Sequence, residues 1–376
     1  MKIGILTLPL HANYGGILQA YALQTVLERM GHEVEVIDRN LDAKYPWWRW
    51  ILILVKRLLF IYVFRDKKTE LFVERRRRKE RSIIEQNTRV FINKYIHIRK
   101  VNKYTEVKEN DYDAIVVGSD QVWRPIYFGE EMIQHAYLDF AKNWKNLMRI
   151  SYAASFGVDK WEYDEKQTAR CAELIKLFRA VGVRELEAIS LCEKYFGRKA
   201  VQVLDPTMLL DAKDYEVLVK KCNETSPFMA TYLLNTDDKK NKMVSKIAHR
   251  LSLNAIHLNS KYEVRDAPLQ DLVQRAVEDW LFHIKNARLV VTDSFHAAVF
   301  SMIFNVPFVV LLNDERGSSR LYSLLSISKQ VFRIIKEESD VKQIHFQCPE
   351  VNIAKLRGFS EDFLKQNLDK NKNACN

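Results

Sequence analysis

The chain has 376 residues and a formal net charge of +11, from 59 Lys and Arg against 48 Asp and Glu. Hydrophobic residues make up 47% of it, which is enough for a large buried core. With only 11 Gly and 8 Pro, collagen-like, Gly-rich linker and Pro-rich classes are excluded. The length favours two domains.

Cysteine usage points to a reducing compartment. The cysteines are odd in number and form no C-x-x-C pair: Cys171, Cys192, Cys222, Cys348 and Cys375. This pattern favours neither a disulfide framework nor a zinc site. The N-terminus reads as a β-strand and lacks the features of a signal peptide, so we expect a cytoplasmic protein.

Predicted strands and helices alternate along most of the chain. The first set has strands at 2–8, 33–37, 114–117, 149–154, 180–183 and 201–204, with helices at 16–30, 165–179 and 185–196. After Asp205-Pro206, the second set has strands at 228–234, 254–258, 288–291 and 307–311, with helices at 238–251, 270–285, 295–304 and 318–326.

This alternation predicts parallel sheets with helices on both faces, that is, an α/β protein with two Rossmann-like lobes. We expect one lobe over residues 1–205, a second over 206–345 and a helical tail over 346–376. In such a fold, ligands bind at the carboxyl ends of the strands.

A basic and aromatic helical insertion interrupts the first lobe at about residues 44–100. Its segment 47–64 is apolar, but three Lys and Arg residues are too many for a membrane-spanning helix. They share one side of the helix, which suits a helix lying in the membrane interface. A basic run at 75–81 adds attraction for anionic lipid or nucleic acid. The alternatives are a buried helical hairpin with a solvated basic face, and contact with a protein partner.

The loop after the first strand holds the first candidate binding residues. Gly15 and Gly16 allow close backbone approach, and the N–H groups at the helix start, next to Asn13, can hold an anion or a sugar. The alternative is a tight turn between strand and helix.

A second polar loop, with Ser119, Asp120 and Trp123, follows the strand at 114–117. Asp120 is a candidate general base for a hydroxyl, and Trp123 is a candidate stacking platform for a sugar ring. The alternatives are a helix N-cap for Asp120 and a packed core position for Trp123.

Arginines and a histidine follow the later strands. Arg184 comes directly after a strand and suits bidentate binding of a carboxylate or phosphate, with a surface ion pair as the alternative. His296 lies in the first turn of a helix, after Ser294. It could pass a proton beside a bound anion, or be a structural histidine. Arg316 and Arg320, four apart in a polar loop, form a candidate anion clamp. No metal motif is present, so we expect no metal.

Five stretches of the sequence resemble the polysaccharide pyruvyl transferase family. They are Asn13–Gln24, Val117–Trp123, Val183–Glu185, Leu204–Thr207 and Asp293–His296, in the family's order over about residues 1–330. The resemblance implies a two-lobed fold similar to GT-B glycosyltransferases. It also implies transfer of the enolpyruvyl group of phosphoenolpyruvate onto a pair of sugar hydroxyls, giving a pyruvate ketal in surface-polysaccharide biosynthesis, such as that of exopolysaccharide or capsule.

The resemblance also implies roles for residues of this chain. The family's histidine and one phosphoenolpyruvate-binding arginine correspond to His296 and Arg184. Many members carry an arginine where this chain has Ser294, so Arg316 or Arg320 is the candidate replacement. In the implied reaction His296 is the candidate acid, and Asp120 the candidate base or hydroxyl orienter. Phosphoenolpyruvate is the donor substrate, and no cofactor is expected.

Two alternatives stay open at this stage. One is a nucleotide-sugar glycosyltransferase of the same architecture, and the other is a non-catalytic, membrane-associated scaffold for glycan synthesis. The expected partners are phosphoenolpyruvate, a glycan or lipid-linked oligosaccharide acceptor and, through residues 47–81, the inner face of the membrane. Nucleic acid is not expected, because the basic residues gather in one insertion.

Overall fold

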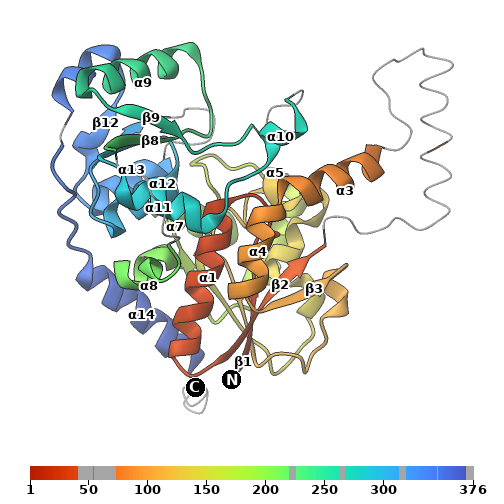
Figure 1. Ribbon diagram of the computed structural model, residues 1–376. Coiled ribbons are helices and arrows are strands. Elements are labelled where there is room, and N and C mark those ends of the chain that lie inside the picture. The colour runs from red at the N-terminus through yellow and green to blue at the C-terminus, as the bar shows by residue number, and fades with distance from the viewer. Residues whose placement is uncertain are drawn as a thin grey trace.

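The computed structural model describes residues 1–40, 54, 73–219, 226–261, 267–312, 319–344 and 346–369. In the described residues, two parallel sheets form the centres of two lobes (Figure 1). The two-lobed α/β fold expected from the alternation of strands and helices is therefore confirmed.

The first lobe is built on a seven-stranded sheet in the order β3-β2-β1-β4-β5-β6-β7. Its strands are β1 (Lys2–Leu6), β2 (Glu33–Arg39), β3 (Ile98–Val101), β4 (Ala114–Val117), β5 (Met148–Ala154), β6 (Ala180–Val183) and β7 (Val201–Gln202). All neighbouring strands run parallel. In β4, Ala114 and Val116 join one hydrophobic core while Ile115 and Val117 join another. The strand is continuously apolar because both faces of the sheet are covered.

The second lobe has a five-stranded parallel sheet in the order β12-β11-β10-β8-β9. Its strands are β8 (Phe228–Tyr232), β9 (Asn254–His257), β10 (Leu289–Thr292), β11 (Phe308–Leu311) and β12 (Ile334–Ile335). The predicted boundary at residues 205 and 206 falls between the last strand of the first sheet and the first strand of the second.

Helices pack around both sheets (Figure 1). In the first lobe they are α1 (Tyr14–Arg29), α3 (Val73–Ile84), α4 (Gln86–Tyr95), α5 (Pro125–Phe128), α6 (Glu165–Ile175) and α7 (Leu186–Phe196). After residue 205 they are α8 (Ala212–Glu216), α9 (Asp238–Leu251), α10 (Leu269–Leu272), α11 (Val277–Asn286), α12 (Phe295–Ile303), α13 (Ser319–Ile327) and α14 (Ala354–Leu368). Helix α1 contacts α12 and α4 contacts α11, so these four helices join the lobes.

The basic insertion is helical over part of its predicted length. Helices α3 and α4 fall within it, but the prediction is wrong at its end, where β3 pairs in parallel with β2 from Val36 to Arg39. Apart from Leu54, the apolar segment 47–64 lies outside the described residues, so its amphipathic helix stays a prediction. Within the described part of the chain, every helix is too short or too polar to cross a membrane.

The helix expected over 270–285 is two helices, α10 and α11, joined by an extended linker. Gln274 in this linker donates its backbone N–H to Ile84 O (3.1 Å), and its backbone oxygen accepts from Asn87 Nδ2 (2.7 Å). The Tyr14 hydroxyl donates to its side chain (3.1 Å). A continuous helix would use these backbone groups internally, so contact with the first lobe overrides the local helical periodicity.

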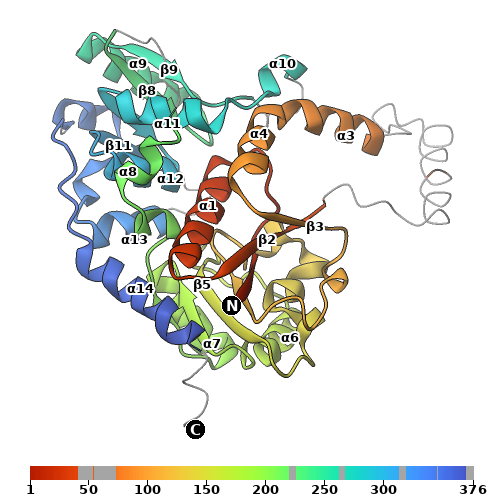
Figure 2. The same ribbon diagram turned by 60° about the horizontal axis from the view of Figure 1, so that its bottom comes forward.

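The C-terminal tail returns to the first lobe, where α14 lies beside β5 (Figure 2). The rings of Phe363 and Tyr152 have centroids 6.2 Å apart. A Cβ on Gly182 of β6 would lie 3.0 Å from the Phe363 ring, so the glycine makes room for the aromatic side chain. The Ser360 hydroxyl accepts a 2.9 Å hydrogen bond from Leu204 N–H, which fixes the helix beside the chain leaving β7.

We expect Leu364→Ala to lower the free energy of unfolding by about 2–5 kcal/mol, because Leu364 is fully buried on the inner face of α14. Leu356→Ala on the same helix, at a side chain 38% exposed, should change it by about 1 kcal/mol or less. Urea unfolding of both variants tests this. Equal effects would show that α14 is not docked on the first lobe.

Candidate functional site

A cluster of polar side chains lies where the N-terminal ends of α1 and α12 meet, at the carboxyl ends of the strands. Asn13 belongs to the loop between β1 and α1. Its Oδ1 caps α1 by accepting from Gly16 N–H (3.3 Å), and its Nδ2 donates to Asp120 Oδ2 (3.4 Å). The two predicted polar loops of the first lobe are therefore brought together through Asn13 and Asp120.

Gly15 lies directly against His296 of the second lobe. A Cβ added there would lie 2.0 Å from His296 Nδ1, closer than any side chain tolerates. His296 itself is 7% exposed, in the first turn of α12. A glycine is required at position 15 because the imidazole occupies the space that a side chain would fill.

Arg184 lies directly after β6 and holds two carboxylates from different loops. Its Nη1 donates to Asp205 Oδ2 (3.0 Å), and its Nη2 donates to Asp120 Oδ1 (3.4 Å). All three side chains are almost completely buried. The surface ion pair considered for Arg184 is thus wrong, because its partners lie in the interior.

Asp205 is the centre of the cluster, although no site role was predicted for it from the sequence. Its Oδ1 accepts from the N–H (3.1 Å) and the hydroxyl (2.7 Å) of Thr207. Its Oδ2 accepts from Ser119 Oγ (3.2 Å) and lies 3.7 Å from His296 Nε2. The signal in the sequence was its place just after the last strand of the first lobe, inside the Leu204–Thr207 stretch.

The backbone at Asp120 is also unusual. Its φ of 66° lies in the left-handed region, which non-glycine residues seldom adopt. Its carbonyl accepts from Val122 N–H (2.7 Å) and Ser155 N–H (3.1 Å), which holds this conformation. Such local strain concentrates at functional sites.

Electrostatics keep both aspartates ionised. Burial raises the pKa of Asp120, but the charges of Arg184, His296 and Arg320 outweigh it and leave that pKa below its ordinary value. Burial likewise raises the pKa of Asp205, but the nearby charges of His296 and Arg184 and the hydrogen bond from Thr207 bring it well below the ordinary range. Because the favourable partners outweigh the desolvation cost, the charges stabilise one another.

Arg320 enters the same electrostatic neighbourhood from the first turn of α13. Burial, and then the charge of Arg184, lower its pKa to about 10. Two guanidinium groups from different lobes thus repel each other, and a bound anion would relieve that repulsion. Arg316 lies outside the described residues, so of the two candidate arginines only Arg320 can be placed.

Two buried donors in the cluster have no hydrogen-bond partner among the described residues: Arg184 Nε and His296 Nε2. Ser294 is buried at the N-cap position of α12, but its side chain makes no capping hydrogen bond. Its backbone N–H donates to Thr292 Oγ1 (3.0 Å). Buried donors without acceptors are rare, and a ligand bound in this cluster would complete the hydrogen bonding of both.

Trp123 lies away from this cluster, and its predicted role as a sugar platform is not supported. Its side chain is fully buried and stacks on Tyr137, with ring centroids 5.1 Å apart. Its Nε1 donates to Ala136 O (3.3 Å). Core packing therefore occupies the indole, in agreement with the alternative considered from the sequence.

The family model for "Polysaccharide pyruvyl transferase" matches residues 13–315. The chain belongs to the polysaccharide pyruvyl transferase family. Its activity is that of a transferase, in polysaccharide pyruvylation, and the family implies a polysaccharide or glycan acceptor. Among curated protein sequences, none matches the chain.

Solved epimerases share the fold of this pyruvyl transferase. A putative UDP-N-acetylglucosamine 2-epimerase from Listeria monocytogenes has a TM-score of 0.53 at 11% identity, over 97% of this chain and 95% of that chain. The UDP-GlcNAc 2-epimerase from Methanocaldococcus jannaschii has a TM-score of 0.51 at 11% identity, over 97% of this chain and 100% of that chain. At this identity the likeness shows the fold alone, a two-lobed, GT-B-like arrangement.

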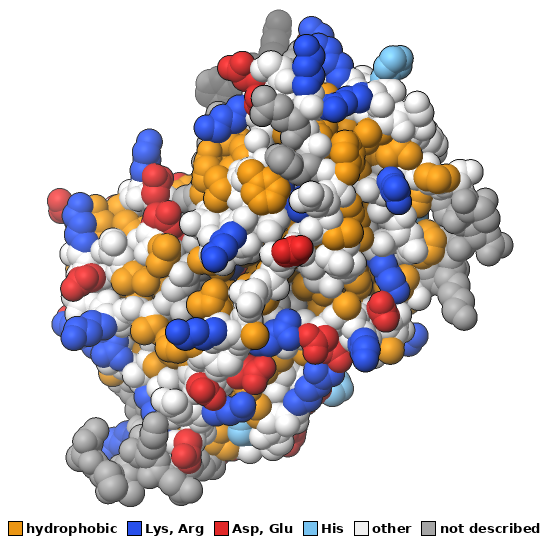
Figure 3. All heavy atoms as spheres, turned by 90° about the vertical axis from the view of Figure 1, so that its left-hand side faces the viewer, with side chains coloured by type: hydrophobic (Ala, Val, Ile, Leu, Met, Phe, Trp, Pro, Cys, Tyr) orange, Lys and Arg blue, Asp and Glu red, His pale blue; other side chains and the backbone are white. Residues whose placement is uncertain are grey.

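The charge of the transferase is spread over the face seen in Figure 3. There the described Lys and Arg side chains are scattered among acidic and hydrophobic ones. That face therefore presents no continuous basic surface among its described residues, which a nucleic-acid backbone would need.

We expect Gly15→Ala to destabilise the transferase by about 1–3 kcal/mol, because the new methyl group overlaps the His296 ring. Gly358→Ala is the control, since a Cβ at this position in α14 meets no atom within 4 Å. A helical Gly→Ala change in open space stabilises by about 0.5–1 kcal/mol. Urea unfolding distinguishes the two, and stabilisation by both would contradict the contact between Gly15 and His296.

The depressed pKa of Asp205 predicts a pH-dependent contribution to stability. The ionised group stabilises the folded protein above its unfolded pKa of 3.8, and this stabilisation is lost as the pH falls below that value. Asp205→Asn should therefore cost about 3 kcal/mol at neutral pH, with the difference from wild type narrowing in acid. Exposed Asp159 provides the control variant Asp159→Asn. A difference that does not change with pH would contradict the ionised state of Asp205.

Proposed function

We propose that the cluster binds phosphoenolpyruvate and transfers its enolpyruvyl group to a pair of hydroxyls on a glycan. The supporting observation is the pair of buried donors without acceptors, Arg184 Nε and His296 Nε2, contributed by the two lobes. Phosphoenolpyruvate carries a phosphate and a carboxylate, and guanidinium groups bind both in bidentate geometry. Arg184 and Arg320 would hold these anionic groups.

His296 is proposed as the acid. It protonates C3 of the enol, and C2 then accepts the oxygen of the first sugar hydroxyl. The bond between C2 and the phosphate oxygen breaks, and the second hydroxyl closes the ketal. Of the two hydroxyl protons, one replaces the proton that His296 delivered to C3, and the other leaves with inorganic phosphate. The reaction therefore balances without a redox step or a cofactor.

Asp120 serves better as a positioning residue than as a base. A general base works best when its pKa is near the working pH, whereas the pKa of Asp120 lies below even the ordinary carboxyl value. Its carboxylate instead fixes Arg184 and Asn13. Asp205 orients Arg184 by accepting from its Nη1 (3.0 Å), and its carboxylate lies 3.7 Å from His296 Nε2.

The first test is a thermal-shift titration with phosphoenolpyruvate beside a panel of nucleotide sugars. A ligand that binds only the folded state raises Tm as it saturates. We expect phosphoenolpyruvate to raise Tm, and Arg184→Lys to weaken this effect because lysine cannot replace the guanidinium fork. Stabilisation by a nucleotide sugar alone would favour the glycosyltransferase alternative, and no response to either class would favour the scaffold.

The second test measures phosphate release from phosphoenolpyruvate with a panel of glycosides that carry neighbouring hydroxyls. His296→Gln should lower the rate about 100-fold or more, because the general acid is lost. His249→Gln changes an exposed histidine of α9 and should leave the rate unchanged. Equal rates for the two variants would remove His296 from the mechanism.

A further inference from the structure

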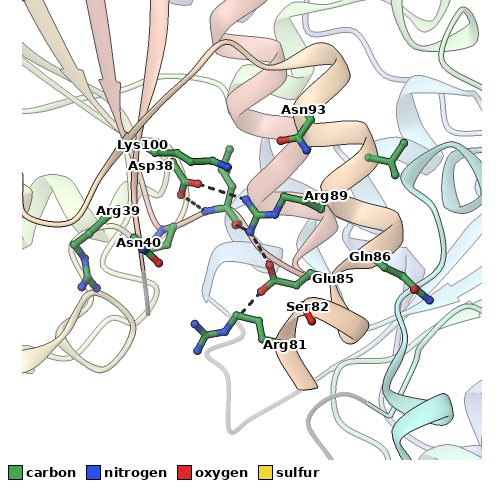
Figure 4. A pocket seen from close by; sticks show the side chains of 13 residues that line it. Asp38, Arg39, Asn40, Arg81, Ser82, Glu85, Gln86, Arg89, Asn93 and Lys100 are labelled. Atoms are coloured by element: carbon green, nitrogen blue, oxygen red, sulfur yellow. Dashed lines mark hydrogen bonds and ion pairs between the residues drawn. The ribbon is translucent and has the colours of Figure 1, made fainter. Parts of the chain in front are cut away.

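A second polar site lies in the first lobe, outside the catalytic cluster. A cavity of about 510 Å³ opens between the loop after β1, the ends of β2 and β3, and helices α3 and α4 (Figure 4). Most of the residues that line it are polar or charged, and they include Asp38, Arg81, Glu85, Arg89 and Lys100. The mechanism proposed above uses none of these side chains.

The charge in this cavity is positive. Four cations, Arg39, Arg81, Arg89 and Lys100, line it together with two carboxylates, Asp38 and Glu85. Figure 4 shows Arg89 between the carboxylates, with its Nη2 2.6 Å from Glu85 Oε2 and its Nη1 3.5 Å from Asp38 Oδ2. Arg81 lies 3.9 Å from Glu85. The cations exceed the carboxylates, so the cavity attracts a negatively charged ligand.

The rim carries groups that suit a sugar. Gln86 and Asn93 lie on the same side of α4, two turns apart. Ser82 lies in the last turn of α3. All three side chains are exposed at the opening. Amides and hydroxyls both donate and accept hydrogen bonds, as sugar hydroxyls do, so this lining suits a charged sugar better than a bare inorganic ion.

The cavity is tied to the catalytic cluster by one short loop. Leu10 N–H donates to Asp38 Oδ1 (3.1 Å), and Leu10 O accepts from Arg89 Nη2 (2.9 Å). Three residues later Asn13 binds Asp120 in the cluster. Three residues span at most about 11 Å, so a chain of a few sugars can reach from one site to the other.

We propose that this cavity holds a negatively charged unit of the glycan acceptor, a sugar that bears a phosphate or a carboxylate group. The adjacent part of the glycan then presents its hydroxyls to the catalytic cluster. The inference rests on the proposed function only for the identity of the ligand as the glycan acceptor. The binding itself depends on Arg81, Lys100 and the groups around them.

Calorimetric titration with glucose 1-phosphate, glucuronic acid and glucose tests the site in the full-length protein. We expect the charged sugars to bind and glucose to bind at least about tenfold more weakly, because it lacks a charge-assisted hydrogen bond. The stronger of the two charged probes identifies phosphate or carboxylate as the recognised group. Equal binding of glucose and both charged sugars would overturn the proposal.

Variants locate the binding. Lys100→Gln removes one cavity charge from an exposed side chain, and should weaken binding of the charged probe about tenfold. Lys103→Gln removes an equal charge from an exposed lysine outside the cavity lining and should leave binding unchanged. Arg81→Gln should act in the same direction as Lys100→Gln. If Arg184→Lys weakens probe binding and Lys100→Gln does not, the probe sits in the catalytic cluster and the proposal fails.

Repeating these titrations on protein saturated with phosphoenolpyruvate separates the two proposals. Binding of glucose 1-phosphate that depends on Lys100, in a protein that phosphoenolpyruvate does not stabilise, would overturn the donor assignment and support the anionic-sugar site. Stabilisation by phosphoenolpyruvate with probe binding that is indifferent to Lys100 would overturn the anionic-sugar site alone. If both the donor assignment and the anionic-sugar site are correct, Lys100→Gln should raise KM for a charged acceptor and leave KM for phosphoenolpyruvate unchanged.

Discussion

The arrangement of the strand ends around the candidate site depends on charges that are buried together. Removing an ion such as Arg184, Asp205 or Asp120 from water costs several kcal/mol, and only close opposite charges and hydrogen bonds offset that cost. Asp205 obtains both from Arg184, Thr207 and Ser119. Because these partners come from separate loops, the strand ends that carry them are held in one arrangement. His296 then faces this arrangement from the second lobe, 3.7 Å from Asp205.

The packing around the cluster serves the same arrangement. Tyr14 begins α1, stacks on Trp280 of the second lobe with ring centroids 5.2 Å apart, and donates its hydroxyl to Gln274. Its neighbour Gly15 leaves space for His296. Apolar packing and hydrogen bonds thus fix the start of α1 beside His296. Rigid support of this kind keeps polar groups ready for a ligand.

The two polar sites of the first lobe share a structural element. The loop after β1 is held at Leu10 by Asp38 and Arg89, and it ends in Asn13 and Gly15 at the catalytic cluster. The ion pair between Asp38 and Arg89 therefore holds one end of the loop, and this helps to fix the hydrogen bond between Asn13 and Asp120 at the other end. This continuity is the physical reason for placing a glycan across both sites.

The sequence alone determined the order of strands and helices, because buried parallel strands read as short apolar runs and their helices repeat every few residues. It also placed Asn13, Asp120, Arg184 and His296 at strand ends, and its family resemblance was confirmed by the family match. These are local properties of the chain.

Only the tertiary structure decided which of these side chains meet. Trp123 is in the core because aromatic neighbours distant in sequence cover it, and residues 270–285 do not form one helix because Gln274 binds the first lobe. Asp205 gained its role from partners up to 91 residues away, which no local pattern encodes. Ion pairs and packing between distant segments depend on distances in the folded chain, and those distances do not follow from spacing along the sequence.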